Sequence, residues 1–126
     1  MLLALAAALP FAFATDAAAH ARLTRAVPSD GSSLATPPAK IDLWFNELLD
    51  DDFNDVAVHR ANADGGPADD ENFATGKPQV DPSDRTHLVT DLRPLAPGDY
   101  VVQWKVLSRD GHSARGRVRF SVGKQD

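Results

Sequence analysis

The chain has 126 residues, a formal net charge of −5 and no cysteine. This length suits one domain, and the acidic balance disfavours a nucleic-acid-binding protein, which needs a basic face. The lack of cysteine excludes disulfides, zinc–thiolate sites and thiol nucleophiles.

Residues 2–14 form an almost wholly apolar run, LLALAAALPFAFA. The run is shorter than the roughly 20 residues of a transmembrane helix, and it has the length of the apolar part of a signal peptide. Residues 17–19 are three alanines, the small-residue pattern that signal peptidase accepts. We therefore predict a cleavable signal peptide over residues 1–19 and an exported domain over residues 20–126. No Lys or Arg precedes the apolar run, so a membrane anchor or a buried segment is the alternative.

The rest of the chain has the pattern of short strands separated by turn-forming residues. Strands are predicted over residues 40–45, 56–58, 86–92, 100–107 and 116–122. No window of helical length shows an apolar stripe with a period of 3.6 residues. Residues 62–84 are polar and rich in Gly, Pro and Asp, so we predict a long loop there with at most one short strand.

Alternation is clearest in the last two predicted strands, where every second residue is apolar. The inward-facing residues are predicted to be Tyr100, Val102, Trp104, Val106, Val118, Phe120 and Val122. A turn that leads into Tyr100 is typical of a tyrosine corner, a feature of Greek-key sandwiches. The pattern as a whole predicts an all-β fold, a small antiparallel β-sandwich.

Cleavage after Ala19 would make His20 the N-terminal residue of the exported protein. An N-terminal histidine offers its α-amine and its imidazole Nδ1, which together close a six-membered chelate ring on a metal ion. The pKa of an α-amine is ordinarily about 7.7–8.0, so a strongly Lewis-acidic metal can displace its proton near neutral pH. His20 is therefore a candidate metal ligand that exists only after cleavage.

Asp110 and His112 form a second candidate set, in the segment SRDGHS. If the chain stays extended there, two residues that are two positions apart project from one face. Together with His20 they supply three nitrogens and one carboxylate, a set that suits Cu(II). The chain lacks cysteine, and its only methionine is Met1, which disfavours a Cu(I) site.

Simpler interpretations of the same residues stay open. The Asp-Gly-His segment can be an ordinary turn. Asp110, His112 and Ser113 have the residue types of a hydrolase triad, but residues so close in sequence rarely reach triad geometry, and no nucleophile-elbow motif is present. His59 and His87 are predicted to be surface residues rather than ligands. The acidic residues 69–71 lack EF-hand spacing and are predicted to be solvated.

The chain resembles the CopC/PcoC family of periplasmic copper-binding proteins. The resemblance rests on five segments: HARL at residues 20–23, VPSDG at 27–31, PAKIDLWFNE at 38–47, LAPGDYVVQWKVLSRDGH at 95–112 and GRVRFSV at 116–122. The most specific of these is the Gly-x-Tyr-x-Val-x-Trp strand that runs into Ser-x-Asp-x-His.

The resemblance implies a Greek-key β-sandwich or barrel of the Ig-like or cupredoxin-like kind. It implies a Cu(II) site formed by the amine and Nδ1 of His20 with Asp110 and His112. Glu47 matches a family glutamate that lies near the metal, as a weak ligand or as a partner that orients a ligand. Some family members also bind Cu(I) through a methionine-rich loop. The matching region here, residues 56–77, has no methionine, so the resemblance implies a member that binds Cu(II) alone.

The resulting hypothesis is a periplasmic, monomeric Cu(II) carrier or buffer in copper resistance or uptake, and not an enzyme. Its expected partners are a copper ion and a CopD-type inner-membrane copper transporter, with no role for nucleic acid. One alternative is a monooxygenase that acts on polysaccharide through a histidine brace. In that case Asp110 would occupy a coordination position that such enzymes keep open, and the chain is short for an extended substrate face. The other alternative is a metal-free Ig-like interaction module.

Overall fold

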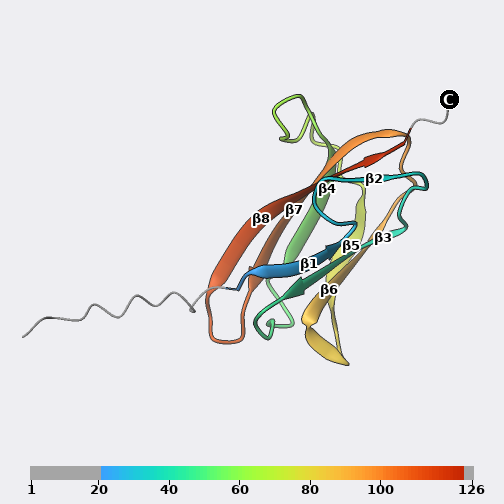
Figure 1. Cartoon of the computed structure of the whole chain (residues 1–126). Coiled ribbons are helices and arrows are strands. Elements are labelled where there is room, and N and C mark those ends of the chain that lie inside the picture. The colour runs from blue at the N-terminus through green and yellow to red at the C-terminus, as the bar shows by residue number, and fades with distance from the viewer. Residues whose placement is uncertain (1–20, 124–126) are drawn as a thin grey trace, which may run out of the picture.

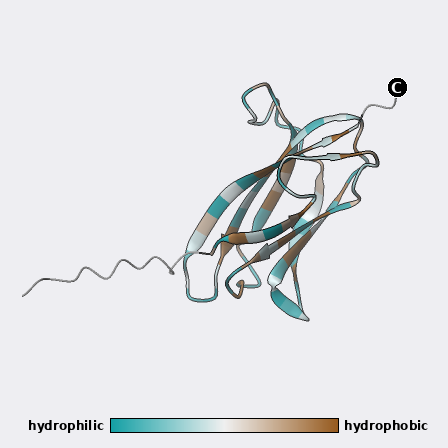
Figure 2. Cartoon of the chain, in the orientation of Figure 1, coloured by the Kyte–Doolittle hydropathy of each residue, from teal (hydrophilic) through white to brown (hydrophobic). Residues whose placement is uncertain are grey.

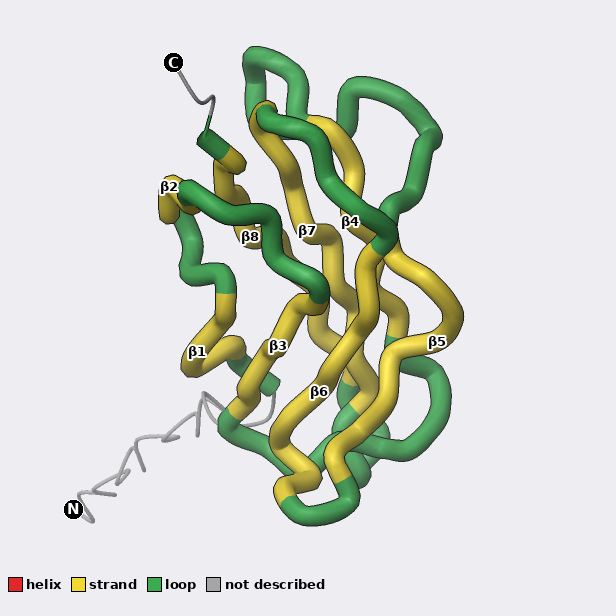
Figure 3. The backbone as a smooth tube through the Cα atoms, turned by 90° about the vertical axis from the view of Figure 1, so that its right-hand side faces the viewer, coloured by secondary structure: helices red, strands yellow, loops and turns green. Residues whose placement is uncertain are grey.

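Two four-stranded β-sheets pack face to face in the computed structural model, which describes residues 21–123 (Figure 1). The strands are β1 (Leu23–Val27), β2 (Ser32–Leu34), β3 (Lys40–Phe45), β4 (Asp55–Arg60), β5 (Ala74–Asp81), β6 (Asp84–Leu92), β7 (Gly98–Leu107) and β8 (Ser113–Val122). The sheets form separate layers in Figure 3, with strand orders β1-β3-β6-β5 and β2-β8-β7-β4. The all-β sandwich predicted from the sequence is confirmed. No helix among residues 21–123 is long and apolar enough to cross a membrane.

The chain changes sheet at every connection except the two hairpins, β5–β6 and β7–β8. All strand pairs are antiparallel except β2–β8, which is parallel. The predicted antiparallel sandwich is therefore confirmed, with one short pair, β2–β8, that is parallel. The reason is that β2 has only three residues and joins the edge of a sheet after the chain has crossed from the other layer.

The five strands predicted from alternation correspond to β3, β4, β6, β7 and β8. Residues 62–84 were predicted to be a long loop with at most one short strand, and they contain one strand, β5 (Ala74–Asp81), which is longer than expected at eight residues. This strand lies at a sheet edge beside β6, and none of its side chains is buried, so it shows no clear apolar alternation. Gly76, with φ of 68°, and Pro78 also interrupt its pattern. The short strands β1 and β2 were not predicted either.

The core lies between the sheets and follows the predicted alternation of β7 and β8. Brown and teal bands alternate along the long strands in Figure 2. Tyr100 is fully buried, and its hydroxyl donates a hydrogen bond to the carbonyl of Ala96 at 2.5 Å. This bond is the tyrosine corner expected from the sequence. Burial raises the pKa of the Tyr100 phenol above its usual value.

The β7–β8 hairpin is the longest paired unit of the fold. Its register runs without a break from Gly98 opposite Val122 to Leu107 opposite Ser113. The turn that joins these strands therefore projects from a continuous ladder, and the predicted ligands Asp110 and His112 lie in this turn.

Candidate metal centre

The β7–β8 turn brings Asp110 and His112 together. The backbone N–H of Ser108 donates to the carbonyl of His112 at 2.9 Å, and the N–H of Gly111 donates to the carbonyl of Ser108 at 3.0 Å. Gly111 has φ of 89°, in the left-handed region that glycine adopts without strain. As a result the His112 Nδ1 lies 3.1 Å from Asp110 Oδ1. The two side chains meet because the chain turns between them. The condition set for this contact, an extended segment, is therefore not met.

A buried serine holds the carboxylate of this pair. Ser108 is 1% exposed, and its hydroxyl donates to Asp110 Oδ1. The backbone N–H of His112 approaches Asp110 Oδ1 as well, at 3.4 Å. The hydrogen bond from Ser108 and then the contact with His112 lower the pKa of Asp110 below its ordinary value of 3.8. At neutral pH the carboxylate is therefore ionised and suited to a cation.

Ser108 was not singled out from the sequence. Its signal was its position, two residues before Asp110 at the end of a strand, where a hydroxyl commonly accepts or donates across a turn. The two side chains that it orients stay open to solvent, with 50% of Asp110 and 45% of His112 exposed. A metal ion thus has access to a carboxylate oxygen and to the imidazole.

The loop between β3 and β4 lies against this turn and places Glu47 at the same end of the sandwich. The N–H of Arg109 donates to the carbonyl of Leu48 at 3.0 Å. Leu49 is fully buried and forms a β-bridge with Ser108. Glu47 directly precedes this bonded segment and is partly exposed.

The start of the described chain reaches the same end. The N–H of Arg22 donates to Asn46 Oδ1 at 2.7 Å, and the N–H of Asn46 donates to the carbonyl of Arg22 at 3.1 Å. Ala21 is buried in the core. Asn46 is the neighbour of Glu47, so the chain start, the β3–β4 loop and the β7–β8 turn lie side by side (Figure 1).

His20 lies outside the described residues, so its role as a ligand stays a prediction. Among residues 21–123, no group of three or more His, Cys, Asp or Glu side chains is arranged to hold a metal ion. Of the predicted ligands within that range, the structure brings the side chains of Asp110 and His112 together.

His87 has a different place from the one predicted. Its side chain is only 13% exposed, with Nε2 at 2.7 Å from Asp42 Oδ1 and Nδ1 at 3.1 Å from Asp81 Oδ2. The ring lies parallel to the Trp44 indole, with centroids 4.2 Å apart, and Arg25 covers the indole at 4.7 Å. The prediction of a surface residue is therefore wrong. Both ring nitrogens face carboxylates, which gives His87 a structural role in the sheet.

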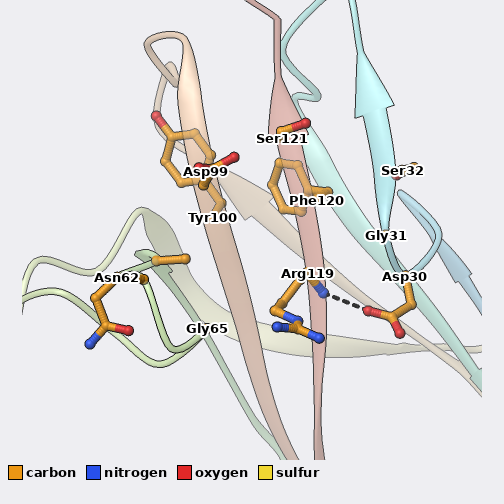
Figure 4. A pocket seen from close by; sticks show the side chains of 12 residues that line it. Asp30, Gly31, Ser32, Asn62, Gly65, Asp99, Tyr100, Arg119, Phe120 and Ser121 are labelled. Carbon is orange, nitrogen blue, oxygen red and sulfur yellow. Dashed lines mark hydrogen bonds between the residues drawn. The ribbon is translucent and has the colours of Figure 1, made fainter.

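The far end of the sandwich holds a hollow of about 350 Å³ (Figure 4). Its charged lining residues are Asp30, Asp99 and Arg119, and the Asp30 carboxylate accepts a hydrogen bond from the backbone N–H of Arg119 at 2.9 Å. No histidine lines this hollow. His59 lies in β4, with its Nδ1 at 2.7 Å from the carbonyl of Glu71. Neither feature supplies a second donor set for copper.

Residues 23–123 match the family model of the CopC domain. The chain belongs to the CopC family. The resemblance inferred from the sequence is thereby confirmed, and with it membership of a copper-binding family associated with copper resistance and transport.

Two curated relatives illustrate the range of the CopC family. Copper resistance protein C of Pseudomonas syringae pv. tomato is 34% identical over 109 residues, which cover 84% of this chain and 82% of that protein. Copper transport protein CutJ of Bacillus subtilis (strain 168) is 32% identical over 110 residues, which cover 86% of this chain. The match spans only 19% of CutJ, so this chain corresponds to a small part of that relative.

Solved structures of the CopC family have the same fold. CopC from Methylosinus trichosporium OB3b superposes with a TM-score of 0.72 at 25% identity, over 85% of this chain and 97% of that one. PcoC, described as a methionine-rich copper resistance protein from Escherichia coli, superposes with a TM-score of 0.67 at 29% identity, over 83% and 100% of the two chains.

Proposed function

We propose that this CopC-family chain is an exported protein that binds Cu(II) and carries or buffers it in the periplasm. The ligands would be the amine and imidazole of His20, the carboxylate of Asp110 and the imidazole of His112. Glu47 would act as a weak ligand or as a partner that orients one. The observation that carries this proposal is the Asp110–His112 pair. Asp110 Oδ1 and His112 Nδ1 lie 3.1 Å apart in a solvent-accessible turn.

The chemistry of these donors supports Cu(II) over other ions. Imidazole and amine nitrogens with a carboxylate oxygen suit Cu(II), which also binds such sites more tightly than the other divalent ions of the first transition row. Methionine thioethers would favour Cu(I), and the described residues contain none. The copper ion is cargo here, so the role of the protein is to bind it, to keep it from other ligands and to release it.

The proposal includes removal of residues 1–19, because only then does His20 carry a free amine. It also includes a CopD-type membrane transporter as the partner that exchanges copper with this chain. The match to CutJ supports the second point, because a domain like this chain makes up a small part of a longer protein named for copper transport.

A Cu(II) titration of two matched proteins tests the N-terminal ligand. One form begins at His20, and the other carries one additional glycine in front of it. The extended form should bind Cu(II) far more weakly, because its amine can no longer close the chelate ring with the imidazole of His20. Equal affinities would overturn the proposed role of the N-terminus.

A second set of titrations tests whether the β7–β8 turn supplies a copper ligand. His112→Ala should weaken Cu(II) binding strongly, whereas His59→Ala, which removes a histidine from another part of the fold, should leave it unchanged. Acidification should release the metal, because amine and imidazole must lose their protons to bind it. An unchanged affinity of His112→Ala would overturn the site.

A further inference from the structure

We propose that the loop between β3 and β4 presents a docking surface for the protein that exchanges copper with this chain. The surface consists of Leu48 and Phe53, which are apolar and exposed, together with Asp52 and Asp55; we call it the Phe53 patch. Its partner would offer an apolar pocket edged by Lys or Arg side chains. This inference rests on the proposed carrier function. The experiments below distinguish a failure of the docking surface from a failure of copper binding.

Phe53 combines an exposed aromatic side chain with a backbone conformation that is unfavourable for a bulky residue. Its side chain is 77% exposed, and its backbone has φ of 66°, which makes it the one non-glycine residue with positive φ among residues 21–123. Bulky side chains rarely occupy the left-handed region, because Cβ crowds the following carbonyl. An exposed aromatic ring in this conformation contributes little to folding, so the stability of the monomer does not explain why a phenylalanine is placed there.

The loop that carries Phe53 is held firmly on both sides. The side-chain amide of Asn54, a buried residue, donates to the carbonyl of Asp50 at 2.7 Å, and Asn54 Oδ1 accepts the N–H of Leu107 at 2.9 Å. Leu49 is fully buried in the core. The aromatic ring is therefore displayed from a fixed backbone, which lowers the entropic cost of binding a partner.

The Phe53 patch is continuous with the proposed copper site. A hollow of about 440 Å³ lies beside Phe53. It is also lined by the charged residues Asp55 and Lys105, and by Leu107 and Ser113 at the two ends of the β7–β8 turn. The carbonyl of Leu48, the second apolar residue, accepts the N–H of Arg109 in that turn. A protein that covers the patch would therefore lie over the turn that holds Asp110 and His112.

The charges of the loop select the kind of partner. Asp51 forms an ion pair with Arg85. Asp55, the first residue of β4, lies opposite Lys105 of β7, but neither Asp52 nor Asp55 forms an ion pair with any residue of the described range 21–123. Basic groups on a partner would complement these two carboxylates and would favour encounter in the correct orientation. A second copy of this chain, with its net charge of −5, and an anionic membrane surface would both be repelled.

Site-specific photo-crosslinking in the host cell tests this docking. p-Benzoylphenylalanine replaces Phe53 in one strain and Lys77, an exposed residue of β5, in the control strain. We expect a covalent adduct with one protein from position 53 and none from position 77. Asp52→Lys should abolish the adduct, and Asp70→Lys, which reverses an exposed charge elsewhere, should not. The cross-linked peptide of the partner should contain Lys or Arg beside apolar residues.

A second measurement uses Phe53→Asn in purified protein and in the host. Asparagine tolerates the left-handed region, so the melting temperature should rise, and the Cu(II) affinity should stay within about twofold of that of the parent chain. The copper-dependent growth of the host should nevertheless fall to that of a strain without the gene. Rescue of growth by Phe53→Leu, which restores an apolar side chain, would agree with docking.

The outcomes separate the docking from the carrier function. No adduct from position 53, an adduct with a second copy or with lipid, or a partner peptide rich in Asp and Glu would overturn the docking surface, as would full growth of the Phe53→Asn strain. Failure of the parent chain to bind Cu(II) would overturn the carrier function, and the cross-links would still decide whether the patch binds a basic partner.

Discussion

Gly116 and Trp104 face each other across the β7–β8 pair, and the indole of Trp104 fills the space in which a side chain of Gly116 would lie. A Cβ atom on Gly116 would be 2.5 Å from Cζ2 of the indole. The indole cannot easily move away, because it is 8% exposed and packs edge-on against Phe45, with centroids 5.0 Å apart. The core near the β7–β8 turn therefore depends on the absence of a side chain at Gly116.

Gly116→Ala should lower the free energy of unfolding by about 1–3 kcal/mol, the usual cost of overpacking a core. Chemical denaturation followed by tryptophan fluorescence measures this loss. Gly76→Ala is the matched control, because a Cβ there would meet no atom within 4 Å. Its φ of 68° adds backbone strain of about 1–2 kcal/mol, so the loss in Gly116→Ala should exceed the loss in Gly76→Ala. Equal losses for the two variants would contradict the packing argument.

Ser108→Ala should weaken Cu(II) binding roughly tenfold to a hundredfold, the range seen when a residue that orients a metal ligand is removed. The reason is that the Ser108 hydroxyl fixes the carboxylate of Asp110. A competition titration with a Cu(II) chelator measures the affinity. Ser33→Ala removes a hydroxyl that bonds only Ser121 on the surface, so its affinity should match that of the parent chain.

Phe53→Asn should raise the free energy of unfolding by about 1 kcal/mol, because it relieves a left-handed backbone that disfavours bulky side chains. Equilibrium denaturation gives the value. Asn54→Ala in the same loop should instead lower it by about 1–3 kcal/mol, since the N–H of Leu107 would lose a buried acceptor. A loss of stability in Phe53→Asn would show that the ring supports the fold.

The stability of the protein should fall in acid partly through Asp81. The backbone N–H of Ser83 and then His87 lower the pKa of Asp81 below 3.8. A carboxyl group whose pKa is lower in the folded state stabilises the protein above its ordinary pKa and loses that contribution as the pH falls through its folded pKa. Asp84 acts in the same direction, because the Thr86 side chain and N–H lower its pKa.

Asp81→Asn should therefore show a weaker dependence of stability on pH than the parent chain below about pH 4. Denaturation at several pH values on both sides of that point gives the comparison. Asp99→Asn removes one carboxylate at the far end of the sandwich and serves as the control. Parallel curves for Asp81→Asn and the parent chain would contradict the assignment.

Local patterns were sufficient to predict β7 and β8, because alternation with a period of two places Val102, Trp104 and Val106 on one face. The spacing of Asp110 and His112 also predicted that they would meet, although it predicted this from an extended segment and treated the turn as the alternative to a metal site. What these features share is that the determining residues are neighbours in sequence.

Features that depend on distant segments were missed. His87 was expected at the surface because nothing near it in sequence shows Asp42, its partner 45 positions away. The positive φ of Phe53 was not predicted either: its neighbour Asn54 accepts a hydrogen bond from Leu107, 53 positions later. The position and length of edge strand β5 were not predicted, because it buries no side chain and so leaves no apolar signal in the sequence.

The paired hydrogen bonds between Arg22 and Asn46 have a consequence for the affinity of the proposed site. Two residues of extended chain span at most about 7 Å, so a ligand at position 20 would be tethered closely to the anchored Arg22. If His20 binds copper as proposed, its amine and imidazole are confined to a small volume beside the β7–β8 turn, and their effective concentration there is high. With a tether this short, an N-terminal His20 would act as part of the proposed site.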